Sequence, residues 1–156
     1  MMNTSASIDK AIYRPTSVYG YLRKQHRIGL ISAFILKGIR QQVVNITGQM
    51  DTLRDFIWVE DIANFLANAL LTDVAEPIPT PYVLGSGKPS SISEIKRYVE
   101  LALERKIYVN YSLDLTNSED IIFSPKVFPL DLHPSDLQAT IRHICDDAMS
   151  TGAAFA

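Results

Sequence analysis

Arg54 and Asp55 stand side by side at the start of a run of aromatic and aliphatic residues, FIWV, at positions 56–59. A guanidinium group presents a planar set of N–H donors that can bind phosphate oxygens in pairs, and a charged hydrogen bond contributes about 1.5–3 kcal/mol. The same side chain could instead pair with Asp51, Asp55 or Asp61 and order a loop. The residues alone favour neither role of Arg54, so a phosphate ligand and a structural salt bridge both stay open.

A second candidate for anion binding is the Gly-Ser-Gly-Lys sequence at positions 85–88. Glycines allow backbone N–H groups to approach a phosphate, and lysine adds charge. However, the phosphate-loop pattern requires glycine where this chain has Tyr82, and Ser or Thr where it has Pro89. We therefore predict a tight turn before a capped helix. The sequence also contains no Gly-x-Gly-x-x-Gly motif, so a complete dinucleotide site is absent from it.

Other catalytic chemistries lack their residue patterns. Three histidines and one cysteine occur, without the spacing of metal ligands, at positions 26, 133, 143 and 145. Cys145 continues the apolar rhythm of a predicted last helix, which indicates a buried structural thiol. There is no Gly-x-Ser-x-Gly elbow, and the acidic residues Asp114, Glu119 and Asp120 fit solvated loop positions at least as readily as an acid–base pair. We predict neither a metal site nor a catalytic constellation.

The composition is that of a soluble globular domain. The chain has 156 residues, of which 47% are hydrophobic and 21% charged, and its length suits one domain with one core. A net charge of −2 without a long basic block argues against nucleic-acid binding. No apolar run reaches bilayer length, and the N-terminus lacks the order of a signal peptide. We expect a cytoplasmic protein with no membrane association.

Hydrophobic periodicity predicts the elements that must position Arg54. Helical spacing of apolar residues predicts helices at 28–41, from about Glu60, after a Ser91–Glu94 capping box, and from Ser135 with Gln138 as a second capping box. Short strands are predicted at 43–47, 56–59 and 106–112, and the segment YVLGSGKPSS at 82–91 is predicted to be a short strand ending in a loop. The connector 76–81 is rich in proline, and residues 113–134 form an irregular loop. These pieces predict an α/β fold in which helices and strands pack as one layer.

Several segments in order resemble a known family. They are RPTSVYG at 14–20, LISAFILKGI at 30–39, ITG at 46–48, RDFIWVEDIA at 54–63, YVLGSGKPSSISEI at 82–95, and a capped helix after HPSDL at 133–137. Together they resemble the second half of the extended short-chain dehydrogenase/reductases, in the nucleotide-sugar epimerase and dehydratase branch. The resemblance covers residues 12–145. It implies the C-terminal part of that fold, lacking the N-terminal Rossmann half that holds the cofactor.

The resemblance implies roles for individual residues. The arginine of the family's R-D-F segment contacts the diphosphate of the sugar nucleotide, which favours the phosphate role for Arg54. Thr47 matches a position that approaches the base. Ser17 replaces an asparagine that lies near the nicotinamide and the substrate, so Pro15 and Ser17 are candidates for cofactor contact, and Ser17 also for substrate contact. Asp55 and Asp61 are expected to be structural, through loop hydrogen bonds and helix-end electrostatics.

The family's Rossmann half binds NAD or NADP and supplies a Tyr-x-x-x-Lys pair, whereas none of the seven tyrosines here precedes lysine by four positions. We therefore expect residues 1–12 to be an atypical leader, 13–148 a substrate-binding domain and 149–156 a tail. This domain would bind a nucleotide-diphosphate sugar, hold neither NAD nor NADP by itself, and not be catalytically competent alone.

The alternative is a non-catalytic binding or assembly module derived from that fold. Ser17 and Val83 replace family asparagines, and the family's second phosphate-binding arginine has no equivalent between Tyr111 and Ser124. Either interpretation leaves apolar surface that a Rossmann half would cover, so we expect a homo-oligomer or a missing Rossmann half as partner.

Overall fold

The computed structural model describes residues 11–22, 29–71, 81–112 and 119–152. The expected leader, the tail, most of the connector at 76–81 and the start of the 113–134 loop lie wholly or largely outside the described residues. The described elements, in chain order, are β1 (Tyr13–Pro15), β2 (Ser17–Tyr19), α1 (Leu30–Ile39), β3 (Val44–Thr47), β4 (Leu53–Arg54), β5 (Phe56–Trp58), α2 (Val59–Leu71), β6 (Tyr82–Leu84), β7 (Ser90–Ser91), α3 (Ile92–Leu103), β8 (Val109–Ser112), the 3-10 helix η2 (Pro125–Val127) and α4 (Leu137–Ser150).

The fold is α/β, as expected, and the strands of the described part form four two-stranded pairs. The pairs β1–β6, β2–β5 and β3–β8 are parallel, and β4–β7 is antiparallel. The segment that contains β1 and β2 changes partner at Thr16, because Thr16 N donates to Leu84 O at 2.9 Å and Ser17 N donates to Asp55 O at 3.0 Å. One extended segment therefore joins β6 to β5.

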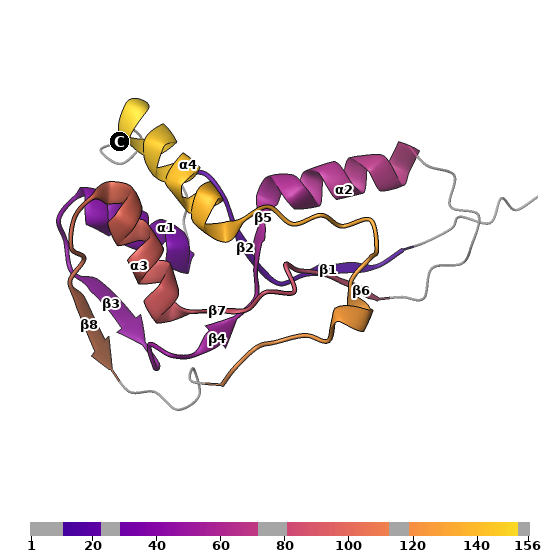
Figure 1. The fold of residues 1–156 in the computed structure, drawn as a ribbon, viewed down its shortest axis with the longest axis horizontal. Helices are drawn as coiled ribbons and strands as arrows, with labels where there is room; N and C mark the ends of the chain where they lie inside the picture. Colours follow the sequence, from indigo (N-terminus) through magenta and orange to yellow (C-terminus); the bar gives the residue numbers. More distant parts are fainter. Residues whose placement is uncertain (1–10, 23–28, 72–80, 113–118, 153–156) are drawn as a thin grey trace, which may run out of the picture.

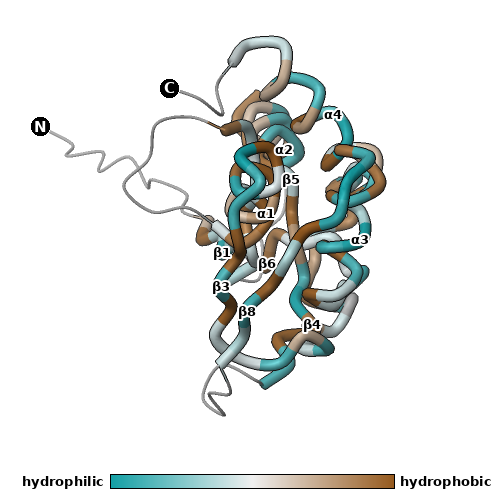
Figure 2. Tube along the Cα trace, turned by 90° about the vertical axis from the view of Figure 1, so that its left-hand side faces the viewer, coloured by the Kyte–Doolittle hydropathy of each residue, from teal (hydrophilic) through white to brown (hydrophobic). Residues whose placement is uncertain are grey.

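The helices α1, α3 and α4 gather at one end of the molecule (Figure 1). There α1, α3 and α4 pack on one another, with β3 and β8 beside them, around the larger of two apolar clusters. Gly38 permits the close approach of α1 to α3, because a Cβ at this position would lie 2.8 Å from Leu103 Cδ1. Figure 2 shows α3 and α4 alternating between hydrophilic and hydrophobic residues along their length, as helices with one buried face do.

A smaller apolar cluster lies at the other end, where α2 covers β1 and β6 (Figure 1). Its buried members are Ile57, Leu84 and Leu132, and Phe65 of α2 packs on them with its ring edge against Tyr13. No residue of α2 is fully buried. Among the described residues, α2 therefore packs through one face only.

The helix starts follow the expected caps in one case and differ in another. Ser91 caps α3 in a complete capping box with Glu94, as predicted. The predicted cap of α4 is wrong: the helix begins at Leu137, and Asp136 is the cap, since its carboxylate accepts from Ala139 N at 2.8 Å. Ser135 is engaged elsewhere, because its N–H and hydroxyl both donate to Asp61, at 2.8 and 2.7 Å. Asp61 thus fastens α2 to the segment that leads into α4.

Candidate functional site

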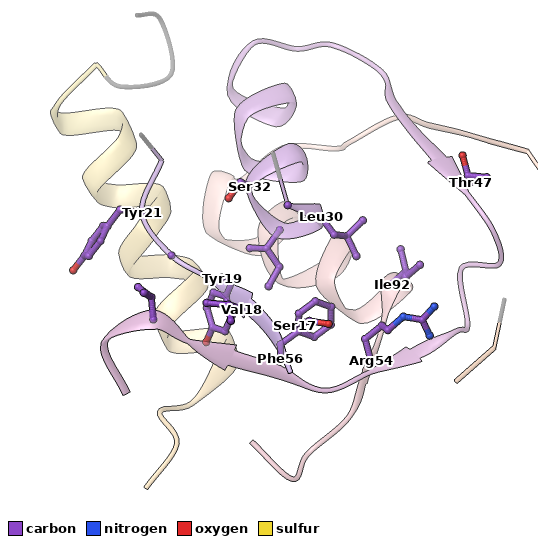
Figure 3. A pocket seen from close by; sticks show the side chains of 14 residues that line it. Ser17, Val18, Tyr19, Tyr21, Leu30, Ser32, Thr47, Arg54, Phe56 and Ile92 are labelled. Atoms are coloured by element: carbon purple, nitrogen blue, oxygen red, sulfur yellow. The ribbon is translucent and has the colours of Figure 1, made fainter. Parts of the chain in front are cut away.

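A cavity of about 650 Å³ lies between β2, the β4–β5 segment and the first turn of α1. Its volume is within the range of small-molecule sites, roughly 300–1,000 Å³. All three residues that the sequence assigns to substrate line it: Ser17 on β2, Thr47 at the end of β3 and Arg54 at the end of β4. Arg54 and Tyr21 lie at opposite ends, with Ser17 between them (Figure 3).

Arg54 is half-buried at the edge of the cavity and bound to backbone oxygens. Its Nη1 donates to Leu53 O at 3.0 Å and also to Glu119 O. The segment that carries Glu119 runs along β4, where Ile121 N donates to Leu53 O at 3.0 Å and Leu53 N donates to an Asp120 carboxylate oxygen at 2.8 Å. The guanidinium is therefore held by residues far apart in sequence.

Asp55, beside Arg54, is a buried structural acid, as expected. The residue is 1% exposed, and its carboxylate accepts from Ser86 N at 2.7 Å, from Gly87 N at 2.8 Å, from Ser86 Oγ at 3.1 Å and from Thr16 Oγ1 at 3.3 Å. These are the loop N–H groups that a phosphate would need in the 85–88 segment. The prediction that this segment is a turn and not a phosphate loop agrees with this geometry.

The same geometry bears on a dinucleotide cofactor. Within the described ranges, the glycine-rich segment at 85–88 cannot cradle a pyrophosphate, because Asp55 already satisfies its amides. Pro15 is exposed on β1 and lies outside the lining of the cavity, while Ser17 lines it. The expectation that this chain alone holds neither NAD nor NADP stays a prediction, as do the roles of Pro15 and Ser17 toward a cofactor.

The end of the cavity opposite Arg54 is aromatic. The rings of Tyr19 and Tyr21 pack on Trp58 with centroids 5.4 and 5.0 Å away, and the Tyr21 hydroxyl is hydrogen-bonded to His143 Nε2 at 3.1 Å. This packing was not visible in the sequence, because α4 is remote from Tyr21 along the chain. The aromatic end can contact an apolar or ring-bearing part of a ligand.

Tyr19 is not an acid–base group near neutral pH. Burial raises its pKa to about 12, against the lowering effect of its 2.6 Å hydrogen bond with Thr140. The Thr140 hydroxyl also lies within hydrogen-bond distance of Asp136 O and Leu137 O. The neutral Tyr19 hydroxyl therefore ties β2 to α4 through Thr140.

Cys145 is a buried thiol. Burial raises the pKa of the Cys145 thiol to about 12, and the side chain is completely buried, as predicted for a structural thiol. Across residues 11–22, 29–71, 81–112 and 119–152, no group of three or more His, Cys, Asp or Glu side chains could hold a metal ion. None of the described helices combines the length and apolar character needed to cross a bilayer.

The α/β fold of this chain has counterparts in known proteins. The model of the NAD dependent epimerase/dehydratase family matches residues 2–85, more than half of the chain, and the chain belongs to this family. A Methanocaldococcus jannaschii protein provisionally named UDP-glucose 4-epimerase is 27% identical over 140 residues, covering 81% of this chain and 44% of that protein.

Two solved structures share the fold. UDP-glucose 4-epimerase of Thermus thermophilus, in complex with NAD, superimposes with a TM-score of 0.73 at 22% identity, covering 87% of this chain and 45% of that one. UDP-N-acetylglucosamine 4-epimerase of Methanobrevibacter ruminantium, in complex with UDP-N-acetylmuramic acid, superimposes with a TM-score of 0.74 at 20% identity. The match covers 94% of this chain and 48% of that one. The predicted fold, part of an extended short-chain dehydrogenase/reductase, is confirmed. The chain spans less than half the length of these relatives.

Proposed function

We propose that this chain binds the nucleotide-diphosphate portion of a nucleotide sugar in the cavity, with Arg54 as the phosphate ligand. The observation that carries the proposal is that Ser17, Thr47 and Arg54, from three different strands, line one cavity of suitable volume. The two solved relatives are complexes with NAD and with UDP-N-acetylmuramic acid, which supports a nucleotide-sugar ligand here.

The chemistry of the cavity matches such a ligand in parts. Arg54 offers paired donors for phosphate oxygens at one end. The hydroxyls of Thr47 and Ser17 can each donate and accept, which suits a base or ribose and a sugar hydroxyl. The apolar wall around Phe56 and the first turn of α1 can pack on the faces of the rings.

In the full reaction of the family, a nicotinamide cofactor would supply the hydride chemistry, and binding residues would hold the reacting carbon of the sugar against it. This chain contributes substrate binding and orientation to such a reaction. We propose that it does not turn over substrate by itself, because its sequence has neither a Gly-x-Gly-x-x-Gly turn nor a Tyr-x-x-x-Lys pair. A cytoplasmic location suits the proposed ligands.

Replacing Arg54 tests the proposal directly. In calorimetric titrations with UDP-glucose and dTDP-glucose, Arg54→Ala should weaken binding by about 10- to 150-fold, which corresponds to one charged hydrogen-bonding group of about 1.5–3 kcal/mol. Arg54→Lys should retain part of the affinity, because lysine keeps the charge and loses the paired donors.

Arg97→Ala is the matched control, since Arg97 is an exposed arginine outside the cavity with its guanidinium over the Tyr98 ring. Equal affinities of the parent and Arg54→Ala for both sugar nucleotides would remove Arg54 from the site. If the parent binds neither ligand, the substrate-binding function itself fails.

A second candidate function, a non-catalytic assembly module, is favoured by one observation. Large apolar side chains are exposed at the end of α2, where Leu70 is 87% and Leu71 85% exposed. Such side chains suit contact with another protein surface. The two functions differ in the titration above: an assembly module binds no sugar nucleotide and associates with itself or with a protein that completes the fold.

A further inference from the structure

The segment Glu119–Ile121 contacts Arg54 and Leu53 from outside the lining of the cavity. It lies along β4 through an isolated parallel bridge between Arg54 and Ile121. The other edge of β4 is paired with β7, where Arg54 is opposite Ser90. Because neighbouring residues of a strand direct their backbone polar groups to opposite edges, Leu53 faces this segment and Arg54 faces β7. β4 is thus held on both edges.

Both backbone polar groups of Leu53 are used by this segment. Leu53 N donates to Asp120 Oδ1 at 2.8 Å, and Leu53 O accepts from Ile121 N at 3.0 Å. A carboxylate acceptor makes the first of these a charge-assisted hydrogen bond. The two bonds fix the backbone immediately before Arg54.

The same docking brings Glu119 O onto the arginine. Arg54 Nη1 donates both to Leu53 O and to Glu119 O, so one guanidinium nitrogen is held between two carbonyls. A guanidinium has five N–H donors in a fixed fork, and fixing one nitrogen orients the whole group. The rotamer freedom of a long side chain is then largely lost before any ligand arrives, which favours binding.

We propose that the segment Glu119–Ile121 is a positioning strap for Arg54, and that Asp120 is its positioning residue. The inference rests on the proposed function in one respect only, the assignment of phosphate binding to Arg54. Asp120 itself acts through Leu53 and not on the ligand. The strap strengthens the binding of a diphosphate, because it orients Arg54, the proposed phosphate ligand. It does not act on the aromatic end of the cavity.

The ligand-free test is nuclear magnetic resonance on the parent chain, Asp120→Ala, Asp120→Asn and Asp131→Ala. Asp131 is an exposed acid outside the strap. Asp120→Ala should speed hydrogen exchange of the Leu53 amide at least tenfold. It should also move the Arg54 Nε–H resonance toward the chemical shift of an arginine whose side chain rotates freely. Asp120→Asn keeps the acceptor oxygen and should restore most of both signals, and Asp131→Ala should change neither. Unchanged Leu53 exchange and an unchanged Arg54 resonance in Asp120→Ala would overturn the strap.

The ligand test is a double-mutant cycle with UDP as the probe and uridine as the reference. Asp120→Ala should weaken UDP binding about three- to tenfold in the parent chain and have no further effect in Arg54→Ala, since interacting residues are non-additive. Uridine binding should be unchanged. An equal loss in both backgrounds would overturn the positioning role, because Asp120 would then act on stability or directly on the ligand. If the parent binds no UDP, the proposed function fails, whereas the strap is still decided by the resonance experiment.

Discussion

Arg54 and Asp55 are neighbours in the sequence but have different structural roles. Arg54 reaches the cavity through a side chain held by carbonyls, whereas Asp55 points into the protein and satisfies the 85–88 turn. Asp55 therefore stabilises the backbone from which the side chain of Arg54 extends. The turn must approach Asp55 and Thr16 closely, which requires glycine at position 85. A Cβ on Gly85 would lie 2.8 Å from Thr16 Cγ2 and 3.0 Å from Asp55 Oδ1.

At this scale we predict that Asp55→Ala lowers the free energy of unfolding by about 3 kcal/mol. The substitution leaves the N–H groups of Ser86 and Gly87 without their charged acceptor in a buried position. Urea unfolding followed by circular dichroism measures the loss. Asp51→Ala, which alters an exposed acid nearby, should change stability by less than about 0.5 kcal/mol. A loss of that small size in Asp55→Ala would mean that the turn is held by other contacts.

Sequence reasoning reached the residues of the site unevenly. Arg54, Ser17 and Thr47 were identified one by one, through motif positions, and the cavity lining contains all three. The strap at 119–121 was missed, because its hydrogen bonds to Leu53 join segments that share no local pattern. The sequence context of Asp120 fits a solvated loop residue at least as readily as an acid–base pair; the residue is exposed, and no sequence signal marks its hydrogen bond to the Leu53 amide.

Among the elements, the connection from α3 to β8 depends on one acid. Glu100 receives Lys96 Nζ at 2.7 Å and the Ile107 N–H at 2.9 Å, and Lys106 lies 4.0 Å away. Burial acts to raise the pKa of Glu100, but the hydrogen bonds and the two lysine charges outweigh it and hold the pKa below its ordinary value. The ionised acid therefore anchors the chain as it leaves the helix.

This lowered pKa predicts a pH dependence of stability. A carboxyl group whose pKa is lower in the folded state stabilises the protein above its unfolded pKa, and the contribution is lost as the pH falls through the folded pKa. Glu100→Gln should therefore be less stable than the parent at pH 7, and the gap should close below about pH 4.5, the ordinary value for glutamate. Thermal melts of both proteins between about pH 7 and pH 3 give the comparison. A gap that stays constant across this range would contradict the assigned ionic role.

Helices were easier to predict than strand partners. The helices at 30–39, 59–71 and 92–103 follow from apolar spacing and, for α3, from the Ser91 cap, all of which are local signals. The predicted cap of α4 was wrong because Ser135 and Asp136 are both good cap residues. Ser135 donates to the distant Asp61, and Asp136 is left to cap the helix. Pairing of strands is non-local, so no periodicity could reveal four separate pairs.

At the scale of the whole molecule, exposed apolar side chains predict self-association. Sedimentation velocity over a range of concentrations should show dimers or larger species, and the double change Leu70→Glu and Leu71→Glu should shift the equilibrium toward monomer, because it places charge on exposed apolar positions. The control is Gln138→Glu with Ala139→Glu, which adds the same charge at exposed positions of α4. A parent chain that stays monomeric at every concentration would argue against both self-association and the assembly role.

The pairing of the strands also governs how the chain can be made. Each described strand pair encloses at least one helix: α1 lies between β2 and β5, α2 between β4 and β7, and longer stretches separate β1 from β6 and β3 from β8. Because a ribosome releases the N-terminal end first, β1 must wait for Leu84 and β3 for Ser112 before their partners are complete. Nascent helices can form early, whereas unpaired strand edges persist through much of synthesis. A chaperone that shields those edges during translation would act on β1 and β3 longest.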